Sequence, residues 1–312
     1  MAGQYNSICI TGVAASVLEA LGVAPRADMQ PPIGALTQLR QCLLGGTVDR
    51  ALLYNPDAIA FWLYQKYTDL FTDAVCRSAV SLPMLSVMPS VTPVCFASMY
   101  TGVTPDVHGI QAYEKPVLTV PTLFDALIAA GKKPAIVSTA GDSISVIFLN
   151  RSMDYFIYDT VGEVNAKAHE LIEADRHDVI VVYNADYDAQ MHRTGPESPE
   201  AMDRLRANIA VYSGLVDAVR NKWPHHNTLY GFMPDHGCHL IDGGCGSHGL
   251  DMDTDRRSEH RNDTPEGEFP ELAAGGGVQQ PDDRQGGRKR QHGTEPTARP
   301  EMCIRDRSER GK

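Results

Sequence analysis

The chain lacks several features that would place it in a common class of protein. Its seven cysteines contain no Cys-x-x-Cys pair, which argues against a disulfide framework and favours free thiols in a reducing compartment. No apolar run is long enough to span a bilayer. The formal net charge is −11 and no basic face precedes the far C terminus, so a general nucleic-acid binder is not expected.

The N-terminal part offers no targeting signal. The apolar stretch 8–23 contains Glu19, and no basic residue precedes Arg26, whereas a signal peptide needs a positively charged start. We therefore expect a soluble, cytoplasmic protein without a membrane partner. The 312 residues are 43% hydrophobic, which is enough for a sizeable core. Residues 1–48 are less regular, and their scattered leucines suggest helices at the edge of the domain.

The composition changes at about Met252. Beyond it apolar residues become sparse, Phe269 is the sole aromatic residue, and no helical or strand period is visible. We interpret residues 253–312 as a disordered tail or as a non-native, frameshift-like end, so the C-terminal part of the fold would be truncated or aberrant. The folded domain is then 1–252, and the basic run 288–290 is not taken as a nucleic-acid signal.

Within this domain, apolar runs alternate with helical patterns. Short, continuous apolar runs predict buried strands at 51–54, 134–138, 179–183 and 229–233. Amphipathic patterns with start and stop signals predict helices at 121–130, 161–174 and 198–222. This alternation predicts an α/β fold. In such folds functional side chains gather at the carboxyl ends of the strands.

Carboxylates and imidazoles stand where apolar runs give way to polar or glycine-rich loops. The candidates are Asp57, Asp188, His192, Asp235, His236 and His248. Aspartate and histidine are the ligands that zinc and similar divalent metals prefer. Asp188 and His192 are four positions apart, so a helical turn or tight loop can bring both to one metal. Taken singly, each candidate could instead be a surface histidine, a helix cap or a turn residue.

Thr92 is the candidate nucleophile. It lies before Pro93, which disfavours helix at Thr92, and the segment 94–100 reads as a helix. The threonine would then lie near a helix N terminus, where a phosphate is favoured. Its hydroxyl is inert at its ordinary pKa, and coordination to a divalent ion would favour the alkoxide. The alternative is that Thr92 only caps the helix.

The order of these residues resembles the alkaline phosphatase superfamily, and within it the type I phosphodiesterase/nucleotide pyrophosphatase-like family. The resemblance covers roughly residues 57–248. Besides the candidate ligands, it rests on Pro89, Thr92, Thr101-Gly102, Pro105, His108-Gly109, Gly195-Pro196, Gly237 and Gly249. It implies a three-layer α/β/α domain with a mostly parallel central sheet.

The resemblance also implies two divalent metal ions, most readily Zn²⁺, with Mn²⁺ as the alternative. One ion would be held by Asp188, His192 and His248, and the other by Asp57, Asp235, His236 and Thr92. The family has Asp-Gly directly after its first strand, whereas this chain has Asn55-Pro56-Asp57-Ala58. Asn55 therefore competes with Asp57 for the first ligand position.

The implied activity is hydrolysis of a small-molecule phosphate ester or diester through a phospho-threonine at Thr92. A sulfatase would need Cys or Ser in a Cys/Ser-x-Pro-x-Arg context, which the segment around Thr92 lacks. A phosphonate hydrolase, a phosphomutase, or a non-catalytic metal- or nucleotide-binding relative remain alternatives. The loop 111–117 is a candidate for contacting the substrate, and the oligomeric state stays open.

Overall fold

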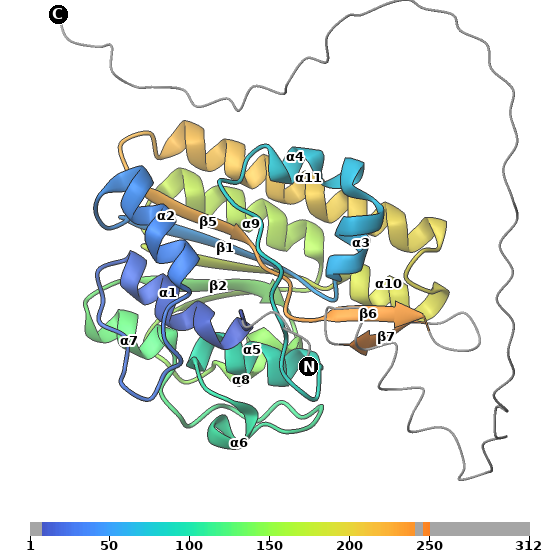
Figure 1. Cartoon of the computed structure of the whole chain (residues 1–312), viewed down its shortest axis with the longest axis horizontal. Coiled ribbons are helices and arrows are strands. Elements are labelled where there is room, and N and C mark those ends of the chain that lie inside the picture. Colours follow the sequence, from blue (N-terminus) through green and yellow to red (C-terminus); the bar gives the residue numbers. More distant parts are fainter. Residues whose placement is uncertain (1–7, 241–245, 250–312) are drawn as a thin grey trace, which may run out of the picture. The chain divides into compact units, whose positions relative to one another are not determined.

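The computed structural model describes residues 8–240 and, as backbone only, residues 246–249 (Figure 1). Within these residues a five-stranded parallel sheet has the strand order β3-β2-β4-β1-β5. Its strands are β1 (Arg50–Pro56), β2 (Pro134–Thr139), β3 (Asp154–Tyr158), β4 (Val179–Asn184) and β5 (Thr228–Phe232). The α/β fold with a mostly parallel sheet is confirmed. The sequence analysis did not predict β3, a partly exposed strand at the edge of the sheet with the sequence Asp-Tyr-Phe-Ile-Tyr.

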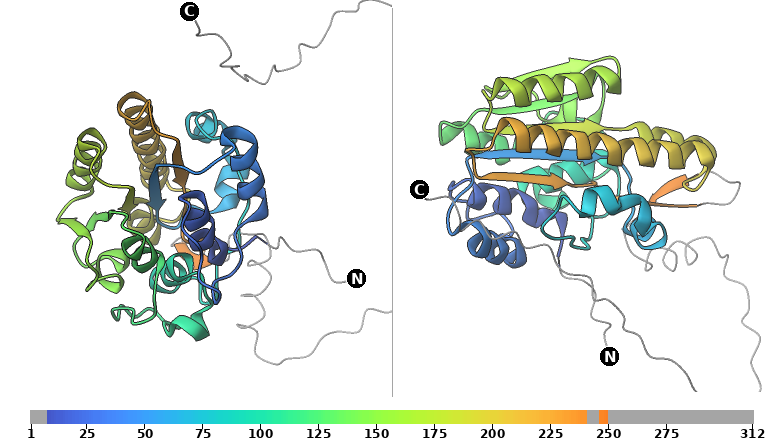
Figure 2. Two further views of the ribbon diagram at one scale, coloured as in Figure 1. Left: turned by 90° about the vertical axis from the view of Figure 1, so that its left-hand side faces the viewer. Right: turned by 90° about the horizontal axis from the view of Figure 1, so that it is seen from above.

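Helices cover both faces of the sheet, as the views in Figure 2 show. One face carries α1 (Val13–Ala20), α5 (Thr92–Thr101), α7 (Leu123–Ala129) and α8 (Ser143–Ile147). The other carries α3 (Phe61–Lys66), α4 (Thr72–Val75), α9 (Val161–Ala174), α10 (Asp186–Thr194) and α11 (Pro199–Lys222). The remaining helices are α2 (Gly34–Leu44), α6 (Pro105–His108) and the 3-10 turns η1 (Ile10–Gly12) and η2 (Thr68–Phe71). The three-layer prediction therefore holds.

The central strands are apolar on both sides because each side packs against helices. In β1, Ala51 and Leu53 join the hydrophobic cluster under α1 and α5, whereas Leu52 and Tyr54 join the cluster under α9 and α11. Successive strand residues point to opposite faces, so a strand buried on both faces needs an apolar residue at nearly every position. This is why the continuous runs located these strands correctly.

Most predicted helices lie within two residues of the observed ones. α9 has the predicted bounds, and its first turn closes through a capping box between Thr160 and Glu163. α5 starts at Thr92, two residues before the predicted helix 94–100, because Val91 is the extended N-cap and Pro93 is tolerated in the first turn.

The first 48 residues contain α1 and α2, which differ in burial. α2 has no buried residue and fits the predicted position at the edge of the domain. In α1, by contrast, all residues except Glu19 are buried, and the helix belongs to the core beside α5. The edge prediction was wrong for α1, because a short helix rich in alanine and valine shows little amphipathic pattern when neighbours surround it.

After β5, the hairpin strands β6 (Gly237–Leu240) and β7 (Gly246–Gly249) pair antiparallel. The predicted tail, residues 253–312, lies outside the described residues. Within the described part of the chain, no helix has the length and apolar character needed to cross a membrane.

Candidate active site

The carboxyl ends of three neighbouring strands carry most of the candidate residues. Asp57 directly follows β1, Asp188 lies in the first turn of the helix after β4, and Asp235 follows β5. In the sheet these strands stand in the order β4-β1-β5. Because they are parallel, their carboxyl ends meet at one edge, and residues far apart in the sequence come together there.

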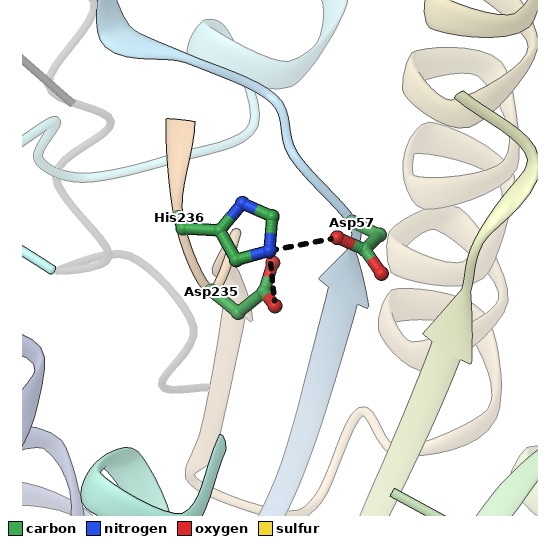
Figure 3. A group of neighbouring side chains, drawn as sticks. All are labelled: Asp57, Asp235 and His236. Carbon is green, nitrogen blue, oxygen red and sulfur yellow. Dashed lines mark ion pairs between the residues drawn. The ribbon is translucent and has the colours of Figure 1, made fainter. Parts of the chain in front are cut away.

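Asp57, Asp235 and His236 form a tight buried cluster (Figure 3). One potential ligand atom from each lies within 4.8 Å of the others. His236 Nε2 is 3.4 Å from Asp57 Oδ1 and 3.2 Å from Asp235 Oδ2. All three side chains are almost completely buried. Figure 3 shows them converging just beyond the end of β1.

Thr92 lies against the same cluster. Its Oγ1 donates to Asp57 Oδ2 at 3.4 Å and is 3.3 Å from His236 Nε2. The N-cap of α5 is Val91, and no side chain caps this helix. The structure therefore places the hydroxyl of Thr92 beside the acids and the imidazole, and does not use it as the helix cap.

The backbone determines which nitrogen of His236 faces the cluster. Nδ1 is 3.0 Å from the carbonyl oxygen of Gly237, so it carries the proton and donates to that oxygen. Nε2 then faces Asp57, Asp235 and Thr92. A histidine whose far nitrogen donates to a backbone carbonyl is oriented as metal-binding histidines are.

The electrostatics of the cluster favour a bound cation. Burial raises the pKa of Asp57 well above its usual range, and the nearby carboxylates of Asp235 and Asp188 raise it further. Burial also raises the pKa of Asp235, and Asp188 adds to this effect. Asp57 Oδ1 and Asp235 Oδ2 are buried and make no hydrogen bond within the described residues. Such acceptors are costly to bury unless a cation or donor compensates them, so this donor set fits one divalent ion.

Asn55, the alternative to Asp57, makes other contacts. Its Nδ2 donates to the carbonyl oxygen of Met233 at 2.8 Å, and its Oδ1 accepts from the Tyr100 hydroxyl at 2.6 Å. These bonds tie β1 to α5 and to the loop after β5. The geometry thus places Asp57 in the cluster, and gives Asn55 a structural role beside it.

The second predicted ligand set is partly assembled. Asp188 and His192 lie on one turn of α10, with His192 Nε2 3.3 Å from Asp188 Oδ1. His192 is 42% exposed at its side chain and Asp188 17%, so this pair is more open than the Asp57 cluster. The backbone of His248 lies in β7 opposite Cys238, and β7 contacts α10. The side chain of His248 lies outside the described residues.

Other residues of the recognised pattern support the helix that carries Thr92. His108 Nδ1 accepts from the Ile110 N–H at 3.2 Å, so Nε2 carries the proton and donates to Ser98 Oγ at 2.8 Å. Gly102 and Gly109 end α5 and α6 with φ values of +74° and +88°, which favour glycine. These residues hold α5 in place and do not reach the cluster through any described contact.

Two further polar residues at this edge were not selected from the sequence. The Tyr183 hydroxyl, at the end of β4, donates to Asp57 Oδ2. Asp142 follows β2, where burial raises its pKa and the charge of Asp188 adds to the shift. Both residues lie at the carboxyl ends of predicted strands. That position in the sequence could have identified them as candidate site residues.

A parallel sheet between two helical layers, with a threonine and clustered acids at its carboxyl edge, is similar to the alkaline phosphatase-like fold. Residues 62–124, which include Thr92, match the family described as type I phosphodiesterase / nucleotide pyrophosphatase. The structural match and this family match together confirm the resemblance to that branch of the alkaline phosphatase superfamily. No curated protein sequence matches the chain.

Among solved structures, the fold is similar to murine ectonucleotide pyrophosphatase/phosphodiesterase 5, determined as an inactive threonine-to-alanine variant in complex with AMP. The TM-score is 0.50 at 16% sequence identity, and the match covers 62% of this chain. It covers 59% of the murine chain, so the present chain spans only part of that relative's length. At this identity the likeness shows the fold alone.

Proposed function

We propose that this protein is a metal-dependent hydrolase of phosphate esters or diesters, with Thr92 as the nucleophile. The observation that carries the proposal is the position of Thr92 Oγ1, 3.4 Å from Asp57 Oδ2 and 3.3 Å from His236 Nε2. A hydroxyl at the start of a buried helix, beside two acids and an oriented imidazole, is suited to nucleophilic attack once a cation is bound. The family match over the segment that carries Thr92 supports the same reaction class.

The proposed ligands form two groups. Asp57, Asp235, His236 and Thr92 would hold one divalent ion, and Asp188, His192 and His248 the other. Zn²⁺ suits this mixture of carboxylates and imidazoles, and Mn²⁺ is the alternative. When bound, such ions supply Lewis-acid chemistry that favours the threonine alkoxide and neutralises charge on the transferring phosphoryl group.

The residues of the chain would position the reacting groups. Asp57 and His236 orient the Thr92 hydroxyl, and their burial excludes bulk water from it. Thr92 Oγ1 forms a bond to phosphorus while the bond from phosphorus to the leaving oxygen breaks, which produces a phospho-threonine. Hydrolysis of this ester by water then restores Thr92 and releases the phosphate product.

A small-molecule phosphate ester is the proposed substrate class. The murine neighbour was solved with AMP, so nucleotide esters are the first compounds to test. The proposal includes no nucleic-acid or membrane partner, and the cytoplasmic location predicted from the sequence stays a prediction.

Turnover of a chromogenic phosphodiester and monoester, measured together with bound metal, tests the proposal. Thr92→Ala is expected to lower kcat on the order of 10³-fold or more while bound metal persists, because the other ligands remain. Thr101→Ala is a matched control, since Thr101 is also buried in α5 but its hydroxyl donates to the Ala97 carbonyl and accepts from the Val103 N–H, away from the cluster.

The possible outcomes separate the alternatives. Bound metal with no turnover of either ester by the wild-type chain would support a non-catalytic metal- or nucleotide-binding protein. Wild-type turnover that persists in Thr92→Ala would contradict the role of Thr92.

A further inference from the structure

Tyr183 contacts the candidate site from the neighbouring strand. It lies near the carboxyl end of β4, in register with Asn55 of β1, and is 2% exposed. Its hydroxyl donates a hydrogen bond to Asp57 Oδ2. The family pattern noted in the sequence did not include this residue, and the proposed reaction does not use it.

This hydrogen bond makes the two oxygens of Asp57 unequal. Oδ2 accepts from Tyr183 and, at 3.4 Å, from Thr92. Oδ1 accepts no hydrogen bond within the described residues and lies 3.4 Å from His236 Nε2. A short aspartate side chain can otherwise rotate about its last torsion, because that torsion has a broad energy profile. The bond to Tyr183, together with the longer bond from Thr92, therefore holds Oδ2 and leaves Oδ1 beside His236.

The Tyr183 ring is itself held by the helix that carries the nucleophile. It packs edge-on against Phe96 of α5, with ring centroids 5.3 Å apart and an interplanar angle of 84°. Phe96 lies one helical turn after Thr92, and it is fully buried. Tyr183 therefore contacts both Asp57, which directly follows β1, and the helix that carries Thr92.

We propose that Tyr183 is a positioning residue that orients Asp57 for divalent-cation binding, with its hydroxyl holding Oδ2 so that Oδ1 is presented to the ion. The inference rests on the proposed metal role of Asp57. Groups that orient a ligand by hydrogen bonding change metal affinity by about 10–100-fold when they are removed. The Tyr183→Phe variant is therefore expected to bind Zn²⁺ about 10–100-fold more weakly, although the ring and its contact with Phe96 remain.

The test is a Zn²⁺ dissociation constant, measured by competition with a chromophoric chelator on the full chain. Tyr54→Phe is the matched control. Tyr54 is also a fully buried tyrosine of the sheet, and its hydroxyl bonds to Asn208 and Asn184 on the other face. Tyr54→Phe is expected to keep the wild-type affinity. Urea unfolding in chelator shows that both variants are folded before their affinities are compared.

A double-mutant cycle with Asp57→Asn distinguishes positioning from a general effect on the fold. If Tyr183 acts through Asp57, its replacement changes Zn²⁺ affinity in the wild-type background and not in the Asp57→Asn background. Equal effects in both backgrounds, or a wild-type affinity in Tyr183→Phe, would overturn the inference and leave the proposed function standing. A wild-type chain that binds no divalent cation would overturn both.

Discussion

The buried acids at the carboxyl edge of the sheet reduce the stability of the metal-free chain at neutral pH. Asp57 and Asp235 are both nearly inaccessible to solvent, and burial is the largest cause of their raised pKa values. A raised pKa means that the folded chain binds more protons than the unfolded chain above about pH 4. Stability is then lost as the pH rises through the folded-state pKa values, and at neutral pH the metal-free fold carries this cost.

We predict that Asp235→Asn stabilises the metal-free protein while it weakens cation binding. The amide keeps an oxygen for the Ala58 N–H but does not ionise, so it removes the cost of burying a carboxyl whose pKa is raised in the fold. Urea unfolding in chelator at pH 7 should show a gain on the order of 1–3 kcal/mol. Asp217→Asn, which removes an ion pair with Arg77, should give no gain. A clear loss of stability in Asp235→Asn would refute this account.

At the scale of the element, α5 begins with the candidate nucleophile and ends at a glycine. Every residue of the helix is buried, Thr92 begins it, and Gly102 follows it in a left-handed conformation. A Cβ at Gly102 would lie 2.9 Å from Met29 Cγ, so a larger residue would collide with its neighbour as well as strain the backbone. His108 ties the following turn to Ser98, in the middle of this helix. The helix that presents Thr92 is therefore held at its middle and at its C-terminal end.

The buried hydrogen bond between His108 and Ser98 predicts how the unfolding free energy depends on pH. Burial lowers the pKa of His108 from 6.5 to about 4, so the neutral ring is the folded form. The contribution of His108 to the unfolding free energy is complete above pH 6.5 and is lost as the pH falls toward 4. The reason is that His108 becomes protonated in the unfolded chain at a higher pH than in the folded chain. Between pH 7 and pH 5 the wild-type protein should lose about 2 kcal/mol more unfolding free energy than His108→Gln.

Urea unfolding at the two pH values, in chelator, measures this difference. The exposed His225 offers a control, since His225→Gln should retain the wild-type pH dependence. If His108→Gln and the wild type lose the same stability between pH 7 and pH 5, the buried neutral role of His108 is excluded.

At the scale of the whole molecule, the hydrophobic core and the candidate ligands lie at different parts of the sheet. The two hydrophobic clusters lie on its faces, whereas the candidate ligands gather at one edge, at the ends of β4, β1 and β5. Loops at that edge carry polar groups which the core would not tolerate. A cation bound there would join segments that are more than 170 residues apart in sequence, such as Asp57 and Asp235.

We therefore predict that Zn²⁺ or Mn²⁺ stabilises the whole folded domain. At a free ion concentration about 100-fold above Kd, binding adds about 2.7 kcal/mol to the unfolding free energy. For a domain of this size, Tm should rise by roughly 5–10 °C, which differential scanning fluorimetry can measure. Asp235→Asn should show a much smaller rise. A wild-type Tm that is the same with either ion as with chelator would count against the cluster as a metal site.

Sequence patterns were sufficient for the parts of this protein that depend on local or periodic signals. Continuous apolar runs located β1, β2, β4 and β5, since a strand buried on both faces must be apolar throughout. The spacing of Asp188 and His192 predicted one helical turn, which α10 provides. The order of Thr92, the acids and the histidines was sufficient to recognise the family resemblance.

Contacts between distant segments decided the rest. Asn55 and Asp57 are both polar residues at the end of one strand, and only their partners, Tyr100 and Met233 for one and Tyr183 for the other, separate their roles. The burial of α1 and the edge strand β3 likewise depend on what packs beside them. The sequence by itself determined which residue types stand at the strand ends, because periodicity is local. Only the tertiary structure decided which of them meet, because strand order and hydrogen-bond partners arise from long-range packing.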